Sequence, residues 1–443
     1  MSRRVGLVFF PALDWAISPT HPEREERLLY TRDQIREEGL LDLPEFVEYR
    51  PSVATEIDVQ RAHVCIPSVA AVAGEPHMVS AGGAITAADI FMRHEVDRSA
   101  ALVRPPGHHA MRIVHGARGF CNINNEAIMV EHIRRVYGAD LKIAFVDTDA
   151  HHADGTQDMY YNDPDVLHIS IHQDGRTLYP GTGFPGELGG PGAYATTLNL
   201  PLPPRTGDEG LMLAVERLVL PVLEDFRPDV LINSAGQDNH YSDPITSMNV
   251  TAQGYARLNA ALDPDILVLQ GGYSVEGALP YVNVGILLAM AGKDFSSVRE
   301  PDLDESDLAQ EEWISPYVKR LCAGLLEVWR ERGRVDPVRL FGSGDFFRRQ
   351  RTIYYDTGGI VERQDEVIRL CRSCPGYRAI DTVAEHQSGR VSRGRAVIIP
   401  WKACGSCRRE GRAEFERSTR GSGPGDVYLQ DHPGDLYIHE TLG

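Results

Sequence analysis

The sequence predicts an α/β protein whose mostly parallel sheet is covered by helices on both faces, followed by a small C-terminal domain. Short apolar runs alternate with segments of helical periodicity, which is typical of parallel sheets with crossover helices. Polar residues repeatedly follow the carboxyl ends of these runs. The length of 443 residues exceeds that of one typical domain, and four of the seven cysteines lie in the last hundred residues. We therefore expect a large domain at residues 1–345 and a small one at 346–443.

The expected elements follow this alternation along the chain. Strands are predicted at residues 4–10, 100–103, 142–146, 166–171, 230–234 and 266–269. Helices are predicted at residues 20–39, 56–61, 86–95, 123–137 and 211–226, with a helical connection at 300–345. Thr20 and Asp208 are candidate N-caps, and Gly82 and Gly83 are read as turn residues. The glycine- and proline-rich residues 175–192 are expected to form a surface loop.

Composition limits the classes of function. Hydrophobic residues make up 42% of the chain, and no apolar run has the length of a membrane span. The apolar N-terminus is interrupted too early for a signal peptide, so we expect a cytoplasmic protein with reduced cysteines. The net charge of −18 is uneven: residues 1–345 carry 29 Lys and Arg against 50 Asp and Glu, and residues 346–443 carry 16 against 13. The large domain should repel nucleic acid and favour cationic ligands.

The densest group of chemically active residues follows the strand predicted at 142–146. In an extended backbone, Asp147, Asp149 and His151 share one face. Carboxylate and imidazole groups with an open position suit catalytic Zn²⁺, and Fe²⁺ or Co²⁺ could use the same set. Asp238, which follows the strand at 230–234, is our third ligand. The alternative is a solvated acidic loop with incidental histidines.

Other polar residues follow other strands. Asp147, His172, Asp238 and Tyr273 all come just after predicted strand ends, the edge where parallel sheets bind ligands. His108 and His109 stand on a loop held by Pro105 and Pro106. Acid–base work requires imidazoles to be oriented by partners, and Asp147 and Asp154 are available for that task.

Together these motifs resemble the zinc-dependent histone deacetylase family, which includes acetylpolyamine amidohydrolases and acetoin-utilisation proteins and has the arginase–deacetylase fold. The resemblance covers roughly residues 4–300. Its motifs are His21–Arg24, Pro105–His109, Gly119–Cys121, Asp147–Gly155, Pro180–Gly183 and Gly271–Tyr273.

The resemblance implies a role for each matching residue. Zn²⁺ would be bound by Asp149, His151 and Asp238. His109 would be the general base and acid, paired with Asp154, and His108 its electrostatic partner, paired with Asp147. Tyr273 would polarise the substrate carbonyl. The resemblance also implies a substrate tunnel lined by Phe120, Tyr179, Gly119 and Gly271, and a K⁺ ion near Asp147, Asp149, His151 and Ser170.

The implied reaction is the hydrolysis of an acylated amine, such as acyl-lysine, to a carboxylate and a free amine. Asn122 and residues 237–240 depart from many eukaryotic members, which leaves the substrate open. An acetylpolyamine amidohydrolase is the first alternative, favoured by the acidic large domain. A two-metal arginase-like hydrolase is a weaker alternative. A non-catalytic acyl-lysine or nucleic-acid binder would have no need of His108, His109 and Tyr273.

The tail contains two Cys-x-x-Cys pairs: Cys371 with Cys374, and Cys404 with Cys407. Their separation of 29 residues is longer than the usual zinc-ribbon spacing, and four thiolates would form a closed structural Zn²⁺ site. Redox pairs or disulfides are the alternative. Arg393, Arg395, Arg408, Arg409 and Arg412 lie near these pairs. We interpret this basic cluster as a surface for docking on the acidic domain or for protein contact, and rank nucleic acid below it; oligomerisation stays open.

Overall fold

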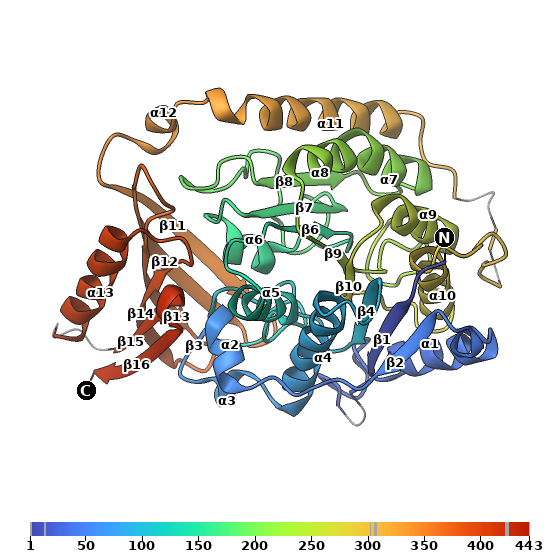
Figure 1. Ribbon diagram of the computed structural model, residues 1–443, viewed down its shortest axis with the longest axis horizontal. Coiled ribbons are helices and arrows are strands. Elements are labelled where there is room, and N and C mark those ends of the chain that lie inside the picture. Colours follow the sequence, from blue (N-terminus) through green and yellow to red (C-terminus); the bar gives the residue numbers. More distant parts are fainter. Residues whose placement is uncertain (1, 13–14, 302, 305–307, 421–424, 443) are drawn as a thin grey trace.

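The computed structural model describes residues 2–12, 15–301, 303–304, 308–420 and 425–442 (Figure 1). Its centre is an eight-stranded sheet in the order β2-β1-β4-β10-β9-β6-β7-β8, in which every neighbouring pair is parallel. The strands are β1 (Val5–Phe10), β2 (Phe46–Tyr49), β4 (Arg98–Val103), β6 (Ile143–Asp147), β7 (Val166–Gln173), β8 (Thr197–Leu202), β9 (Val230–Ala235) and β10 (Ile266–Leu269). The predicted parallel α/β fold is confirmed.

Helices cover both faces of this sheet. The helices of the first part of the chain are α1 (Glu26–Glu37), η1 (Leu40–Asp42), α2 (Glu56–Ala62), α3 (Val69–Val72), α4 (Glu75–Met92), α5 (Asn125–Val136), α6 (Asp154–Tyr160), α7 (Asp208–Ala214), η2 (Val215–Val219), α8 (Leu220–Phe226), α9 (Ala252–Leu262) and α10 (Leu279–Met290). Alternate residues of a strand enter different cores: Ala144 and Val146 pack with α7 to α10, whereas Ile143 and Phe145 pack with α4 and α5. The period-2 geometry of a strand buried on both faces thus builds two hydrophobic cores.

Helix α1 begins at Glu26 with Glu25 as its N-cap, so the prediction of Thr20 as a cap is wrong. Two further local predictions are also wrong. Gly82 and Gly83 lie inside α4 and form no turn. A Cβ on Gly82 would come within 2.1 Å of the Ser52 carbonyl oxygen, so glycine is needed here for close packing of the helix on a neighbouring segment. Asp208 is the first residue of α7, not its N-cap; its carboxylate accepts hydrogen bonds from the backbone N–H and hydroxyl of Thr251. Tertiary contacts decide both cases.

A long helix joins the two sheets of the protein. Helix α11 (Ile314–Glu331) packs its buried Val318, Leu325 and Trp329 on the core formed with α7 and η2. This confirms the helical connection predicted within residues 300–345, and Trp313, just before the helix, is 50% exposed. η4 (Arg332–Arg334) and the short α12 (Pro337–Phe341) follow. No helix in the described part of the chain is long and apolar enough to span a membrane.

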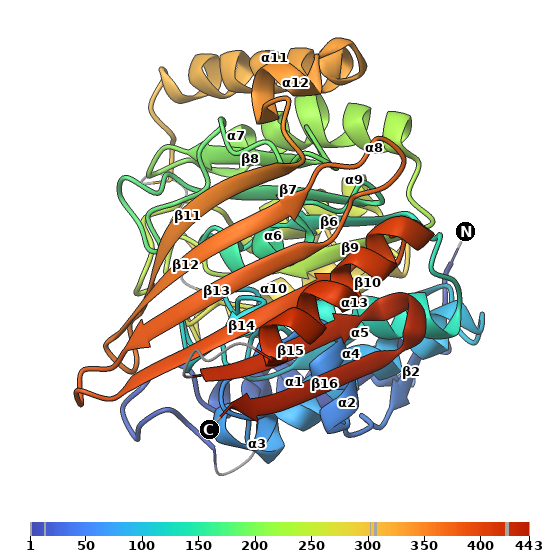
Figure 2. The same ribbon diagram turned by 90° about the vertical axis from the view of Figure 1, so that its left-hand side faces the viewer.

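The C-terminal residues form a second sheet that stands across the side of the first (Figure 2). Its strands are β11 (Phe346–Tyr355), β12 (Ile360–Arg369), β13 (Arg378–Glu385), β14 (Val391–Ile399), β15 (Gly425–Asp431) and β16 (Leu436–Leu442), with α13 (Gly405–Thr419) and η5 (His432–Gly434). Neighbours are antiparallel except β14 and β15. The predicted C-terminal unit is therefore present, and its six-stranded sheet is larger than a zinc ribbon needs.

Apolar and charged contacts hold this second sheet against the rest of the protein. Ile380, Ile398 and Tyr428 pack on the small two-stranded sheet formed by β3 (Val64–Cys65) and β5 (Ile113–Val114). The basic cluster predicted to dock on the acidic domain instead pairs within its own unit: Arg395 with Asp381 and Glu414, and Arg408 and Arg412 with Asp431. Other residues make the charged contacts between the C-terminal unit and the first part of the chain: Arg351 with Asp158, Lys402 with Asp165, and Asp435 with Arg61 and Arg135.

The buried Asp158 of α6 is a central charge of this interface. Its carboxylate forms an ion pair with Arg351 of β11 and accepts a hydrogen bond from the Arg112 backbone at 3.1 Å. Burial opposes its ionisation, but Arg351 and Arg349 outweigh burial and lower its pKa. Ionised Asp158 therefore fixes α6 to the C-terminal sheet.

We predict that Asp158→Asn lowers the free energy of unfolding by about 3 kcal/mol, because Arg351 loses its buried counter-charge. Urea unfolding followed by circular dichroism measures this change. The matched control is Asp365→Asn on the solvent face of β12, where the change should stay within about 0.5 kcal/mol. Equal effects of the two substitutions would contradict this account of the interface.

Candidate active site

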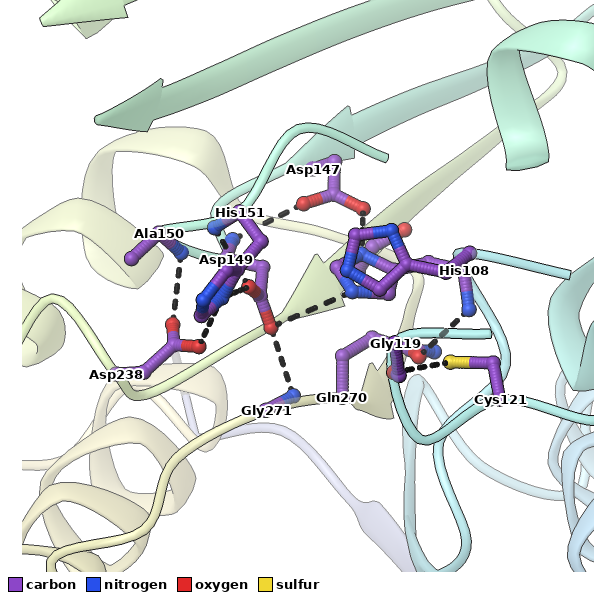
Figure 3. Close-up of polar contacts among 12 residues, drawn as sticks. His108, Gly119, Cys121, Asp147, Asp149, Ala150, His151, Asp238, Gln270 and Gly271 are labelled. Atoms are coloured by element: carbon purple, nitrogen blue, oxygen red, sulfur yellow. Dashed lines mark hydrogen bonds and ion pairs between the residues drawn. The ribbon is translucent and has the colours of Figure 1, made fainter. Parts of the chain in front are cut away.

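Three of the four polar residues predicted to meet at the strand ends do so. Asp147 is the last residue of β6, Asp238 lies three residues after β9, and Tyr273 lies four residues after β10. These three strands are adjacent in the sheet, so their carboxyl ends open into one crevice. Figure 3 shows the aspartates and histidines of these loops converging with His108.

Asp149, His151 and Asp238 form a compact group of buried donors. One ligand atom from each residue lies within 4.8 Å of the other two. His151 Nδ1 is 3.1 Å from Asp149 Oδ1 and 2.9 Å from Asp238 Oδ2 (Figure 3). Two carboxylates and one imidazole, buried around a common centre, fit a divalent metal ion of the zinc type. Two buried negative charges this close also require a compensating cation.

Backbone groups hold these carboxylates in place. Gly271 N–H donates to Asp149 Oδ2 at 2.7 Å, and Ala150 N–H donates to Asp238 Oδ1 at 2.7 Å. A Cβ on Gly236 would lie 2.1 Å from Asp149 Oδ2, and one on Gly271 would lie 2.5 Å from both carboxylates. The two glycines leave the space that the carboxylates occupy. Gly271 thus supports the Asp149 carboxylate, and its predicted contact with substrate stays a prediction.

Each of the two adjacent histidines has its own carboxylate partner. His108 Nδ1 lies 3.1 Å from Asp147 Oδ2, and His108 Nε2 lies 3.8 Å from Asp149 Oδ2. Burial alone would lower the pKa of His108, but these two carboxylates raise it to about 9. Its orientation is set further by Gln270, whose side-chain oxygen accepts the His108 backbone N–H at 3.2 Å. His108 is therefore a fixed, positively charged neighbour of the site.

His109 has the opposite character. Its Nδ1 lies 2.9 Å from Asp154 Oδ1, and burial, together with the nearby His108 and Arg118 charges, lowers its pKa. Because Nδ1 is engaged by Asp154, Nε2 is the nitrogen left for proton transfer. A neutral, oriented imidazole is the form that accepts a proton.

Arg118 also contacts Asp154, and sequence reasoning missed it. Its guanidinium forms an ion pair with the Asp154 carboxylate. Its Nε donates to the Tyr354 carbonyl oxygen of β11 at 3.0 Å. The partner of His109 is therefore linked through one arginine to the C-terminal sheet. In the sequence it is a lone arginine directly before Gly119, and no motif or spacing marks it as a site residue.

Tyr273 lies beside the metal-ligand group, largely buried. Burial raises its pKa, so the phenol keeps its proton and can donate a hydrogen bond. The Arg27 guanidinium stacks on its ring at 4.8 Å. Arg27 is fixed by an ion pair with Glu23 and by hydrogen bonds to the Gln270 and Gly272 carbonyl oxygens. The predicted His21–Arg24 motif thus contributes Glu23, which supports the tyrosine indirectly.

Aromatic side chains stand around the imidazoles and Tyr273. The Phe120 ring packs edge-to-face on Tyr273 at 5.5 Å, and the Tyr179 ring on His109 at 5.2 Å. Gly119, with φ +52°, lies against both: a Cβ there would be 2.3 Å from His109 Cδ2 and 2.9 Å from Tyr179 Cε1. The resemblance implies a substrate tunnel with walls at these residues, and that tunnel stays a prediction.

His172 does not join the group, although its strand-end position predicted that it would. It lies within β7, and its ring nitrogens contact Ser170 Oγ at 2.9 Å and the Gly183 carbonyl oxygen at 3.0 Å. It packs on His152, so both residues support the 175–192 loop. Strand β7 continues two residues beyond the predicted end, which places His172 inside the sheet.

The four paired cysteines meet in a second, separate cluster. Their sulfurs all lie within 4.8 Å of one another, none forms a disulfide, and Cys371 Sγ is 4.0 Å from Cys404 Sγ. Tetrahedral zinc with bonds of about 2.3 Å separates its thiolates by about 3.8 Å. Cys371 and Cys374 follow β12, whereas Cys404 and Cys407 lie at the start of α13. The donor set fits a structural Zn²⁺ site that ties α13 to the sheet.

Comparison with known proteins identifies the family. The "Histone deacetylase domain" model matches residues 67–283. A "Probable deacetylase" of Archaeoglobus fulgidus is 46% identical over 325 residues, which are 67% of this chain and 89% of that protein. A "Histone deacetylase-like amidohydrolase" of Pseudomonas aeruginosa is 35% identical over 241 residues, covering 52% of this chain and 62% of the relative. An "Acetoin utilization protein" of Bacillus subtilis is 34% identical, covering 58% of this chain and 65% of the relative.

The fold agrees with these similarities. The crystal structure of the "HDA15 HD domain" superposes with a TM-score of 0.64 and 26% identity, covering 75% of this chain and 96% of that structure. The matched family model ends at residue 283, before the C-terminal sheet begins. From the parallel sheet, the converging strand-end residues and these relatives together, the chain belongs to the histone deacetylase family.

Proposed function

We propose that the chain is a zinc-dependent amidohydrolase that removes an acetyl or other short acyl group from an amine, such as a lysine side chain or a polyamine. The observation that carries this proposal is the convergence of three buried metal-type donors with two differently tuned histidines and a protonated tyrosine. A protein that only binds an acylated amine needs neither the two histidines nor the tyrosine. Family membership supports deacetylase chemistry, and the zinc dependence, the substrate and the residue roles are our proposal.

Asp149, His151 and Asp238 would hold the metal ion. When bound there, Zn²⁺ supplies Lewis acidity: it polarises the amide carbonyl and lowers the pKa of a water. In the proposed reaction, His109 Nε2 accepts a proton from the attacking water while Asp154 holds Nδ1. Charged His108 lies beside His109, with a ring separation of 4.2 Å, and favours the return of that proton to the departing nitrogen. The products are a carboxylate and a free amine.

The Tyr273 hydroxyl would donate a hydrogen bond to the oxygen that becomes negative as the carbonyl is attacked. Its raised pKa keeps the donor proton in place at neutral pH. The rings of Phe120 and Tyr179 would exclude water around the alkyl part of the substrate. We also propose a K⁺ ion near Asp147, Asp149, His151 and Ser170. Asp147 and Ser170 are paired residues of the adjacent strands β6 and β7.

We predict that Tyr273→Phe lowers turnover by roughly 10²–10³, the usual cost of losing one oxyanion donor. Acetate release from an acetylated amine measures the effect. Tyr30→Phe removes a hydroxyl from an exposed tyrosine on α1 and should keep full activity. Full activity of the Tyr273→Phe variant would contradict the assigned role.

The two metal sites predict a stoichiometry. Metal analysis of the purified protein should find about two Zn²⁺ ions per chain. Asp149→Ala with Asp238→Ala should leave about one ion and no activity, whereas Cys371→Ser with Cys404→Ser should leave about one ion and lower thermal stability. Unchanged zinc content in the cysteine variant would rule out the structural site and leave the catalytic proposal untouched.

A further inference from the structure

The hairpin between β11 and β12 reaches the mouth of the candidate active site. Asp356, the first residue after β11, accepts a hydrogen bond at Oδ1 from the Gly119 backbone N–H at 2.9 Å. The Tyr179 hydroxyl lies 3.5 Å from the same oxygen. Two residues before Asp356, the Tyr354 carbonyl oxygen accepts a hydrogen bond from Arg118 Nε. Three contacts therefore fix this hairpin of the C-terminal sheet, two on the 118–120 segment and one on Tyr179.

This position is close to the reacting groups. Gly119, which Asp356 contacts directly, lies against the His109 ring, and its neighbour Phe120 packs on Tyr273. Asp356 is exposed to solvent and contacts Gly119 and Tyr179, two of the residues expected to line the substrate tunnel. A substrate whose acyl group lies between His109 and Tyr273 would pass its far end along these walls toward the carboxylate.

The negative charge of Asp356 is not used by the protein itself. In the described part of the chain, no lysine or arginine forms an ion pair with it. Arg118, which lies on the segment that the hairpin contacts, is paired with Asp154. His21, whose ring packs on Phe120, also faces Asp356, but burial lowers the pKa of His21 and leaves it neutral at pH 7. The carboxylate is exposed to solvent and is held in place by its hydrogen bonds.

The hairpin contacts do not require that charge. Both hydrogen bonds reach Oδ1, and the amide oxygen of an asparagine would accept them as well. An exposed carboxylate that is positioned at a tunnel mouth and left without a counter-ion is suited to bind a cationic group of a ligand. The excess of acidic residues in 1–345 acts in the same direction.

We propose that Asp356 is a specificity-determining residue that binds the distal ammonium group of an acylated diamine or polyamine. The inference rests on the proposed function, since it names the substrate class of the same site. The residue lies on the C-terminal sheet, beyond the family model's match at residues 67–283, so this segment would set specificity for a catalytic centre built by another part of the chain.

Steady-state kinetics on two amides of matched length test the inference. N-acetylputrescine carries a distal ammonium, and N-pentylacetamide replaces it by a methyl group. The wild-type protein should prefer the cationic amide, and Asp356→Asn should raise KM for N-acetylputrescine by about two- to fivefold, the range expected for an exposed ion pair. The kcat/KM ratio between the two amides should fall accordingly. Added salt should weaken the preference of the wild type and not that of the variant.

Asp345→Asn is the matched control, because it removes the same charge from an exposed residue at the opposite end of β11 and should keep the wild-type ratio. A wild-type protein that hydrolyses both amides equally, or an Asp356→Asn variant with an unchanged ratio, would overturn the inference. An Asp356→Asn defect seen only with uncharged acetyl-lysine peptides would also overturn it. That result would mean that the carboxylate binds backbone N–H groups of a peptide substrate and not an ammonium group. Failure to hydrolyse any of these amides with zinc bound would refute the proposed function instead.

Discussion

The structure of the site depends on the repulsion between two buried carboxylates, Asp149 and Asp238, held around His151. One oxygen of each carboxylate lies within 4.8 Å of the other, and at an effective dielectric constant of about 20 two charges that close repel by at least about 3.5 kcal/mol. Backbone N–H groups of Gly271 and Ala150 offset part of this cost, and a divalent cation bound between the carboxylates would reverse it. The glycines at 236 and 271 are there because nothing larger fits beside these oxygens. The buried donors at these strand ends therefore fit a metal ion, as proposed, better than an apolar core.

The same electrostatics separates the roles of the two histidines. His108 lies against two carboxylates and has a raised pKa, whereas His109 shares its carboxylate with Arg118 and has a lowered one. Adjacent imidazoles in one loop thereby present a fixed charge and a proton acceptor. Burial and the neighbouring His108 charge lower the pKa of His109 most, and Arg118, the second partner of Asp154, adds to them. A β11 carbonyl oxygen holds this arginine, so the C-terminal sheet contributes to the surroundings of the proposed acid–base pair.

This arrangement also explains why the C-terminal sheet is tightly packed on the rest of the protein. Asp158 and Asp154 lie on the same face of α6, one helical turn apart, and each pairs with an arginine that the sheet binds or supplies. Movement of the sheet would disturb α6 and with it the orientation of His109. The Asp356 hairpin extends the same contact surface to the mouth of the site. The cysteine cluster lies at the other end of β11 and β12, where it fixes α13.

The sequence alone predicted the parallel sheet, the Asp149–His151–Asp238 ligand group and the cysteine cluster, from periodicity, from the rule that parallel strands end at one edge, and from motif spacing. The pairing of each histidine with its own aspartate came from the resemblance to a known family. Only the tertiary structure showed that Gly82 and Gly83 lie inside α4, that His172 lies apart from the metal-ligand group, and that Arg118 and Asp356 approach the site. Their partners lie on elements up to 237 residues away in the chain, and no local pattern encodes such a contact. A lone charged residue becomes part of a site only when folding brings a second segment against it.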